Sequence, residues 1–125
     1  MIRYFLSLLI ISFSIAALLH PEVDATLNQT HIRFEWEQIP SVDYYSLYVA
    51  DDDDVYDNCI ICNKIINPES LIHIEKENLE WNKTYYWTIV GYNNDEQLPM
   101  TVRSFNVGPP IANTTTTLYN DSIQE

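Results

Sequence analysis

Two stretches of the chain decide its fold: residues 36–49 read WEQIPSVDYYSLYV, and residues 79–93 read LEWNKTYYWTIVGYN. Each stretch ends in apolar residues that alternate strictly with others, Tyr45, Leu47 and Val49 in the first and Tyr85, Trp87 and Ile89 in the second. Such alternation is typical of a β-strand that buries one face and turns the other towards solvent or a partner. Both stretches are therefore predicted to line one core.

The rest of the chain supplies further short strands, separated by clusters of Pro, Ser, Asp, Asn and Gly that interrupt strands. About seven strands are predicted, at residues 26–30, 31–37, 44–50, 55–66, 71–75, 84–92 and 101–107. No segment has helical periodicity over a useful length. This pattern predicts an all-β fold, a two-sheet antiparallel sandwich of the immunoglobulin type.

The two stretches resemble a fibronectin type III domain, with Trp36 on its second strand and residues 79–93 running through a corner into its sixth. Tyr85, six residues after Leu79, matches the family's corner tyrosine. The resemblance implies that its hydroxyl bonds back to the backbone and that its role is structural. The corner has Trp81-Asn82 where the family has Pro-Gly, and Asn tolerates the positive φ of such a turn.

The resemblance implies a non-catalytic module for binding, adhesion or spacing. Residues 35–49 and 79–87 also resemble the small front module of secreted arylsulfotransferase-like proteins. That second resemblance implies the alternative: an N-terminal accessory domain, here truncated, of a larger exported enzyme. Residues 109–125 form a Thr-rich linker or tail, which suits a chain that connects domains.

The first residues are typical of a secretory signal peptide. Arg3 supplies a positive charge, residues 4–19 are almost entirely apolar, and small residues follow at Ala16, Ala17 and Ala25. Cleavage is expected after Ala25, and cuts after Ala16 or Ala17 are the alternatives. An uncleaved membrane anchor is the competing interpretation, although the apolar run is short for a spanning helix. The prediction is a signal peptide at 1–25, a domain at 26–108 and a location outside the cell or in its envelope, with no membrane attachment after cleavage.

Charge limits the partners of this domain. The chain carries 6 Lys and Arg against 18 Asp and Glu, a net charge of −12, and removal of residues 1–25 leaves −11. Binding to nucleic acid and to anionic membranes requires clustered Lys and Arg. We therefore expect no nucleic-acid partner and no attraction to anionic lipid.

Cys59 and Cys62 form a C-x2-C pair whose role the sequence leaves open. The exported setting favours a local disulfide, although residues i and i+3 of a regular strand point to opposite faces, so a bond requires a bend. Free thiols, or a metal or redox role, are the alternatives. A structural zinc site needs four ligands, and the histidines left after residue 25, His31 and His73, lack metal-type spacing.

The acidic run Asp51–Asp54 with Asp57 could offer oxygens to Ca²⁺, but it lacks the EF-hand order, and a solvated loop is the simpler interpretation. The sequence contains no persuasive catalytic triad and no Gly-rich phosphate loop. We therefore predict no enzymatic activity, no cofactor and no metal site.

The one feature that suggests a contact surface is a group of aromatic residues. If Tyr45 and Tyr85 point inward, the alternation turns the tyrosines of the third and sixth strands outward, together with Thr88 and Val90. These outward tyrosines are Tyr44, Tyr48, Tyr86 and Tyr92. Exposed aromatic clusters mark contacts with a protein, a glycan or a neighbouring domain, and the equal alternative is cross-strand pairing that only stabilises the sheet.

Overall fold

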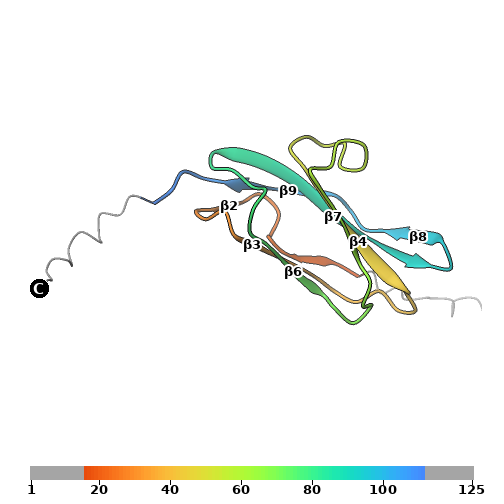
Figure 1. The fold of residues 1–125 in the computed structure, drawn as a ribbon. Coiled ribbons are helices and arrows are strands. Elements are labelled where there is room, and N and C mark those ends of the chain that lie inside the picture. Colours follow the sequence, from red (N-terminus) through yellow and green to blue (C-terminus); the bar gives the residue numbers. More distant parts are fainter. Residues whose placement is uncertain (1–15, 112–125) are drawn as a thin grey trace, which may run out of the picture.

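The computed structural model of the protein describes residues 16–111, and in this range the chain forms nine β-strands and no helix (Figure 1). The strands are β1 (Leu18–His20), β2 (Ala25–Leu27), β3 (Ile32–Trp36), β4 (Tyr44–Ala50), β5 (Ile61–Ile65), β6 (Ile72–Glu75), β7 (Lys83–Asn93), β8 (Glu96–Pro99) and β9 (Arg103–Val107). The prediction of an all-β fold is confirmed.

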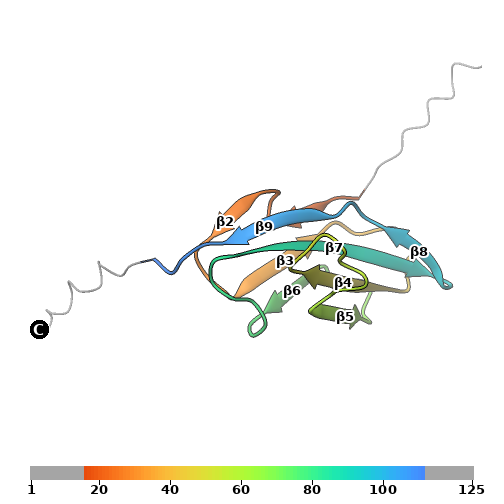
Figure 2. The same cartoon turned by 90° about the horizontal axis from the view of Figure 1, so that it is seen from above.

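The strands form two sheets. The smaller sheet has the order β1-β3-β6, and the larger has the order β2-β9-β7-β4-β5, with β8 paired to the far end of β7. Figure 2 shows the larger sheet from above, with β7 running the length of the molecule. Neighbouring strands are antiparallel except for β2 and β9, which are parallel. The result is a two-layer β-sandwich.

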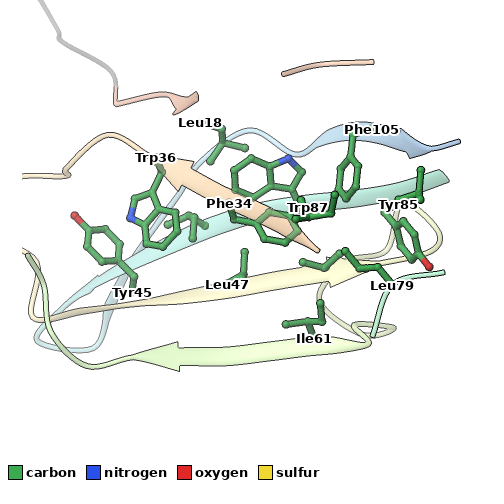
Figure 3. Close-up of a cluster of buried hydrophobic side chains, with 14 of the residues drawn as sticks. Leu18, Phe34, Trp36, Tyr45, Leu47, Ile61, Leu79, Tyr85, Trp87 and Phe105 are labelled. Atoms are coloured by element: carbon green, nitrogen blue, oxygen red, sulfur yellow. The ribbon is translucent and has the colours of Figure 1, made fainter. Parts of the chain in front are cut away.

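The core lies between the sheets and consists of the inward residues of each strand. Figure 3 shows Phe34 and Trp36 of β3 facing Tyr45, Leu47 and Trp87 of the larger sheet. The Phe34 ring packs edge-on against Trp87, with centroids 5.0 Å apart, and Trp36 packs against Tyr45 at 5.7 Å. Large apolar residues alternate along the central parts of these strands, so the two inner faces pack closely on each other. Among the described residues, the indole N–H groups of Trp36 and Trp87 are buried in this core without a hydrogen-bond partner.

Two tyrosine hydroxyls at the edges of the core accept hydrogen bonds from the backbone. The Glu80 N–H donates to the Tyr85 hydroxyl at 2.8 Å, and the Ile39 N–H donates to the Tyr45 hydroxyl at 2.9 Å. Leu79 is buried beside the first of these bonds, and Asn82 has a φ of 61° at the turn into β7. The ring of Tyr85 therefore packs in the core while its polar end fixes the corner.

Several strands of the structure differ from the predicted ones in length or were not predicted. The strand expected at 26–30 is β2, which ends at Leu27, and the strand expected at 55–66 is only β5. β8 was missed because its sequence, EQLP, contains no β-branched residue and ends in proline. Asn94 and Asp95 both have positive φ, as a two-residue type I′ hairpin turn requires, and this turn aligns β8 with β7.

β1 is the other unexpected strand, and it lies ahead of the domain boundary expected at residue 26. Leu18 pairs with Trp36 of β3 and is 5% exposed. The chain then leaves the smaller sheet, turns at residues 21–24 and joins the larger sheet as β2. The folded unit therefore includes residues that the sequence pattern assigns to the signal peptide. The rest of the expected signal peptide, residues 1–15, and residues 112–125 of the expected tail lie outside the described range.

Candidate functional site

Tyr44 and Tyr92 form the centre of an aromatic cluster on the outer face of the larger sheet. They are direct partners in the ladder between β4 and β7. Their rings stack with centroids 4.6 Å apart and planes 10° apart. The hydroxyls of Tyr48 and Tyr92 lie 3.2 Å apart and share a hydrogen bond. Three of the four tyrosines expected on this face are thus in contact.

Two residues that the sequence did not indicate extend this cluster. Tyr56, in the loop after β4, packs edge-on against Tyr48 with ring centroids 5.1 Å apart. The Nζ atom of Lys64 on β5 lies 4.3 Å from the centre of the Tyr44 ring, a cation–π contact. Lys64 pairs with Ser46, so the alternation of β5 could have placed it on this face once the β4–β5 register was known. We call the residues Tyr44, Tyr48, Tyr56, Tyr92 and Lys64 the tyrosine cluster.

Tyr86 stands apart from the tyrosine cluster on the same strand. It is half-buried and lies opposite Ala50 of β4 and Ser104 of β9. Tyr48 lies opposite Thr88 and reaches along the sheet to Tyr92, which is the direction away from Tyr86. The expected set of four tyrosines is therefore a contiguous group of three with one outlier.

Thr88 and Val90 lie on the outer face, as the alternation predicts. The expectation that this face is exposed is wrong at these two positions. Thr88 is 0% exposed and Val90 is 2% exposed. The Thr88 hydroxyl donates a hydrogen bond to the Met100 carbonyl at 3.0 Å, so the segment after β8 covers that part of the sheet. Val90 lies on the same face, opposite Ser46 of β4 and Pro99 of β8. Beside the cluster, the outer face is therefore closed to solvent at these two positions.

The phenols of Tyr92 and Tyr56 stay protonated at physiological pH, because the pKa of each is raised. Burial first, then the hydrogen bond and charge of Tyr48 and the charge of Tyr44, raise the pKa of Tyr92 to about 12. Burial, and to a smaller extent Tyr48, also raises the pKa of Tyr56. Neutral hydroxyls can both donate and accept hydrogen bonds. The cluster thus offers flat apolar rings, polar hydroxyls and one cation to a partner.

The acidic loop borders the tyrosine cluster and forms a network of its own. The side chain of Asp52 accepts hydrogen bonds from the Asp54 N–H at 2.9 Å and from the Asn58 amide at 3.0 Å. Asp51 to Asp54 and Asp57 are all exposed. Within residues 16–111 no group of three or more His, Cys, Asp and Glu side chains is arranged to hold a metal ion. These carboxylates shape the loop and make this rim negative.

A disulfide joins Cys59 and Cys62, whose Cα atoms lie 5.8 Å apart. Cys59 precedes β5, and the Ile60 N–H donates to the Val49 carbonyl at 2.7 Å before the regular ladder begins at Ile61. On a regular strand the side chains of residues i and i+3 point to opposite faces. The bend before Ile61 allows the two cysteine side chains to meet. The bond joins the end of the loop after β4 to the start of β5, and so it anchors the C-terminal end of the loop that carries Tyr56.

The disulfide gives a direct prediction. The non-reduced protein should have a mass about 2 Da below that of the dithiol, because forming the S–S bond removes two hydrogen atoms. Intact-mass spectrometry before and after reduction measures this difference. A Cys59→Ser variant is the control and should show one thiol open to alkylation. Two alkylatable thiols in the untreated wild-type protein would contradict the prediction.

A second polar group surrounds Glu75 at the end of β6. This carboxylate is 7% exposed and accepts hydrogen bonds from the His73 ring at 3.1 Å and from the Asn78 side chain at 2.8 Å. The backbone N–H groups of Glu77 and Asn78 also donate to it. His31, in contrast, is exposed. Burial acts to raise the pKa of Glu75, but these hydrogen bonds together lower it, which indicates a structural group that holds the turn after β6.

The comparisons with known proteins give no family to which this site can be related. No family model matches the chain, and no curated protein matches it. Within residues 16–111 no helix is long and apolar enough to cross a bilayer. The function must therefore be argued from the site itself.

Proposed function

We propose that the chain is an exported, non-catalytic module of the fibronectin type III kind that binds a partner through the tyrosine cluster. The sheet order, the core of Trp36 and Trp87 and the corner bond of Tyr85 support this kind of sandwich. The partner is a protein, a glycan or a neighbouring domain. The observation that carries the proposal is the unbroken series of contacts from Lys64 through Tyr44 and Tyr92 to Tyr48 and Tyr56.

The arrangement suits binding because its groups are held in place before a partner arrives. Stacking and the shared hydroxyl bond fix the rings of Tyr44, Tyr48 and Tyr92, so little side-chain entropy remains to be lost on contact. Tyrosine is over-represented among the residues that dominate interfaces. Tyr56 is 46% exposed, although its ring already contacts Tyr48. Cross-strand pairing alone would stabilise the sheet without such an exposed ring at its border.

Several side chains of the described range that could act in catalysis already have structural partners, which supports a non-catalytic role. The two thiols form the disulfide. The His73 ring lies at hydrogen-bond distance from both Asn63 and Glu75. The acidic side chains of the loop accept bonds from their own backbone.

The test is a comparison of two tyrosine variants with the wild-type protein. Tyr44→Ser combined with Tyr48→Ser removes two rings of the cluster and should weaken binding by about tenfold or more, the effect of losing a dominant interface residue. Tyr86→Ser is the matched control, since it changes a half-buried tyrosine of the same sheet outside the cluster, and should leave affinity unchanged. A glycan array and a pull-down from the extracellular fraction provide the binding assay.

The stability of each variant must be measured beside its binding. The double variant loses a stacked pair, which contributes about 0.5–1.5 kcal/mol, and should still unfold cooperatively. If it binds as tightly as the wild type, the cluster serves only the sheet and the binding surface lies elsewhere. If Tyr86→Ser weakens binding equally, the contact surface is the whole sheet face and not the cluster.

A further inference from the structure

β1 belongs to the folded core of this domain. Figure 3 shows the Leu18 side chain among the core aromatic residues, and it is 5% exposed. The residue before it is also held: the Glu37 N–H donates to the Ala17 carbonyl at 2.9 Å. Ala17 to His20 therefore behave as the first part of the sandwich and not as a leader attached to it.

A cut after Ala25 would break this structure in two places. It would remove β1 and leave the backbone of β3 as an uncovered edge. It would also sever β2 within the strand, because Ala25 pairs with Phe105 and the next residue, Thr26, pairs with Asn106. A cut after Ala16 leaves in place every residue of the nine strands described between residues 16 and 111. Ala16 and Ser14 place small residues at the last and third-last positions of the leader, the pattern that signal peptidases recognise.

The environment of Ala17 contains an acceptor for a new chain terminus. The backbone nitrogen of Ala17 lies 3.0 Å from Oε1 of Glu37. Hydrolysis of the Ala16–Ala17 bond by water gives a carboxylate on Ala16 and an α-ammonium on Ala17, and that ammonium would lie against the Glu37 carboxylate. The bond to the Glu37 carboxylate is already charge-assisted, and the ammonium adds the attraction of an opposite charge to it.

We propose that a signal peptidase cleaves the Ala16–Ala17 bond, so that the mature domain begins at Ala17 with its α-ammonium paired to Glu37. This inference rests on the export included in the proposed function. Cleavage takes place on the translocating chain before folding, so the partial burial of this segment in the folded domain does not protect the bond. The mature protein then keeps all nine strands of the sandwich.

The experiment determines the N-terminus of the full-length chain after export, by N-terminal sequencing and intact mass. The expected start is Ala17, and a start at Thr26 would give a chain nine residues shorter. A processed chain that starts at Leu18, Thr26 or elsewhere would overturn the cleavage site while leaving export intact. A chain retained inside the cell with Met1 in place would overturn export itself and this inference with it.

Two substitutions of equal size provide matched controls. Signal peptidases require a small residue before the cut, so Ala16→Val should abolish the Ala17 start, whereas Ala25→Val should leave it unchanged. Loss of processing in Ala25→Val alone would overturn the site. Valine suits a half-buried strand position, so Ala25→Val keeps the fold testable.

The pair formed by the Ala17 α-ammonium and the Glu37 carboxylate can be tested separately, through the stability of the mature protein. Glu37→Gln keeps the shape of the side chain but removes its charge, so it should lower the denaturation midpoint in dilute buffer and lower it less in 1 M salt, where a Debye length of about 3 Å screens the pair. Equal midpoints for wild type and variant in dilute buffer would overturn the pairing of Ala17 with Glu37.

Discussion

Trp36→Ala is expected to lower the free energy of unfolding by about 3–5 kcal/mol, the usual cost of removing a large aromatic side chain from a core. Trp36 is 1% exposed and packs against Tyr45 across the two sheets. It also pairs with Leu18 of β1. The substitution opens a cavity between the layers and loosens the attachment of β1, and both effects act against the folded state.

Chemical denaturation followed by far-ultraviolet circular dichroism measures this effect, because tryptophan fluorescence would change with the substitution itself. Trp81→Ala is the matched control. Trp81 is 39% exposed in the turn before β7, so its loss should cost far less, as substitutions on a surface usually stay within about 0.5 kcal/mol. Equal effects at the two positions would mean that Trp36 does not occupy the centre of the core.

The central strands could be predicted because their chemistry repeats with period two. In β3, in β4 and in the part of β7 from Tyr85 to Ile89 each inward residue is large and apolar, and matching these faces limits the register of β4 with β7. The corner before β7 could also be predicted, since Leu79 and Tyr85 have the spacing of a known motif. These are local patterns that one segment carries by itself.

The parts that could not be predicted depend on contacts between segments. Leu18 lies near the end of an almost entirely apolar run without alternation, so nothing local distinguishes it as a strand residue that pairs with β3. The burial of Thr88 depends on where the segment after β8 returns. Tyr56 and Lys64 join the tyrosine cluster only because the loop after β4 and strand β5 place them there. Sequence alternation gives the face of a side chain but not its neighbours.

Glu75 shows the same limitation and leads to the second large expected effect. Glu75→Ala should lower the free energy of unfolding by about 1–3 kcal/mol, because it leaves several donors at the end of β6 without an acceptor. These donors are the His73 ring, the Asn78 side chain and two backbone N–H groups. Glu75→Gln is the control: it retains one carbonyl oxygen and should cost less than Glu75→Ala.

The lowered pKa of Glu75 also predicts how stability depends on pH. Burial raises this pKa, but the hydrogen bonds from His73, Asn78 and the backbone outweigh burial, and the folded value lies below the ordinary 4.5. A carboxylate with a lowered folded pKa contributes stability that is fully present above its unfolded pKa and is lost as the pH falls through the folded value. The denaturation midpoint of the wild-type protein should therefore drop as the pH falls below about 4.5. Glu75→Gln has no proton to gain at this position, so its midpoint should fall less steeply over the same interval. Parallel curves for the two proteins between pH 7 and pH 3 would show that other carboxylates govern the acid response and that the turn after β6 does not depend on the charge of Glu75.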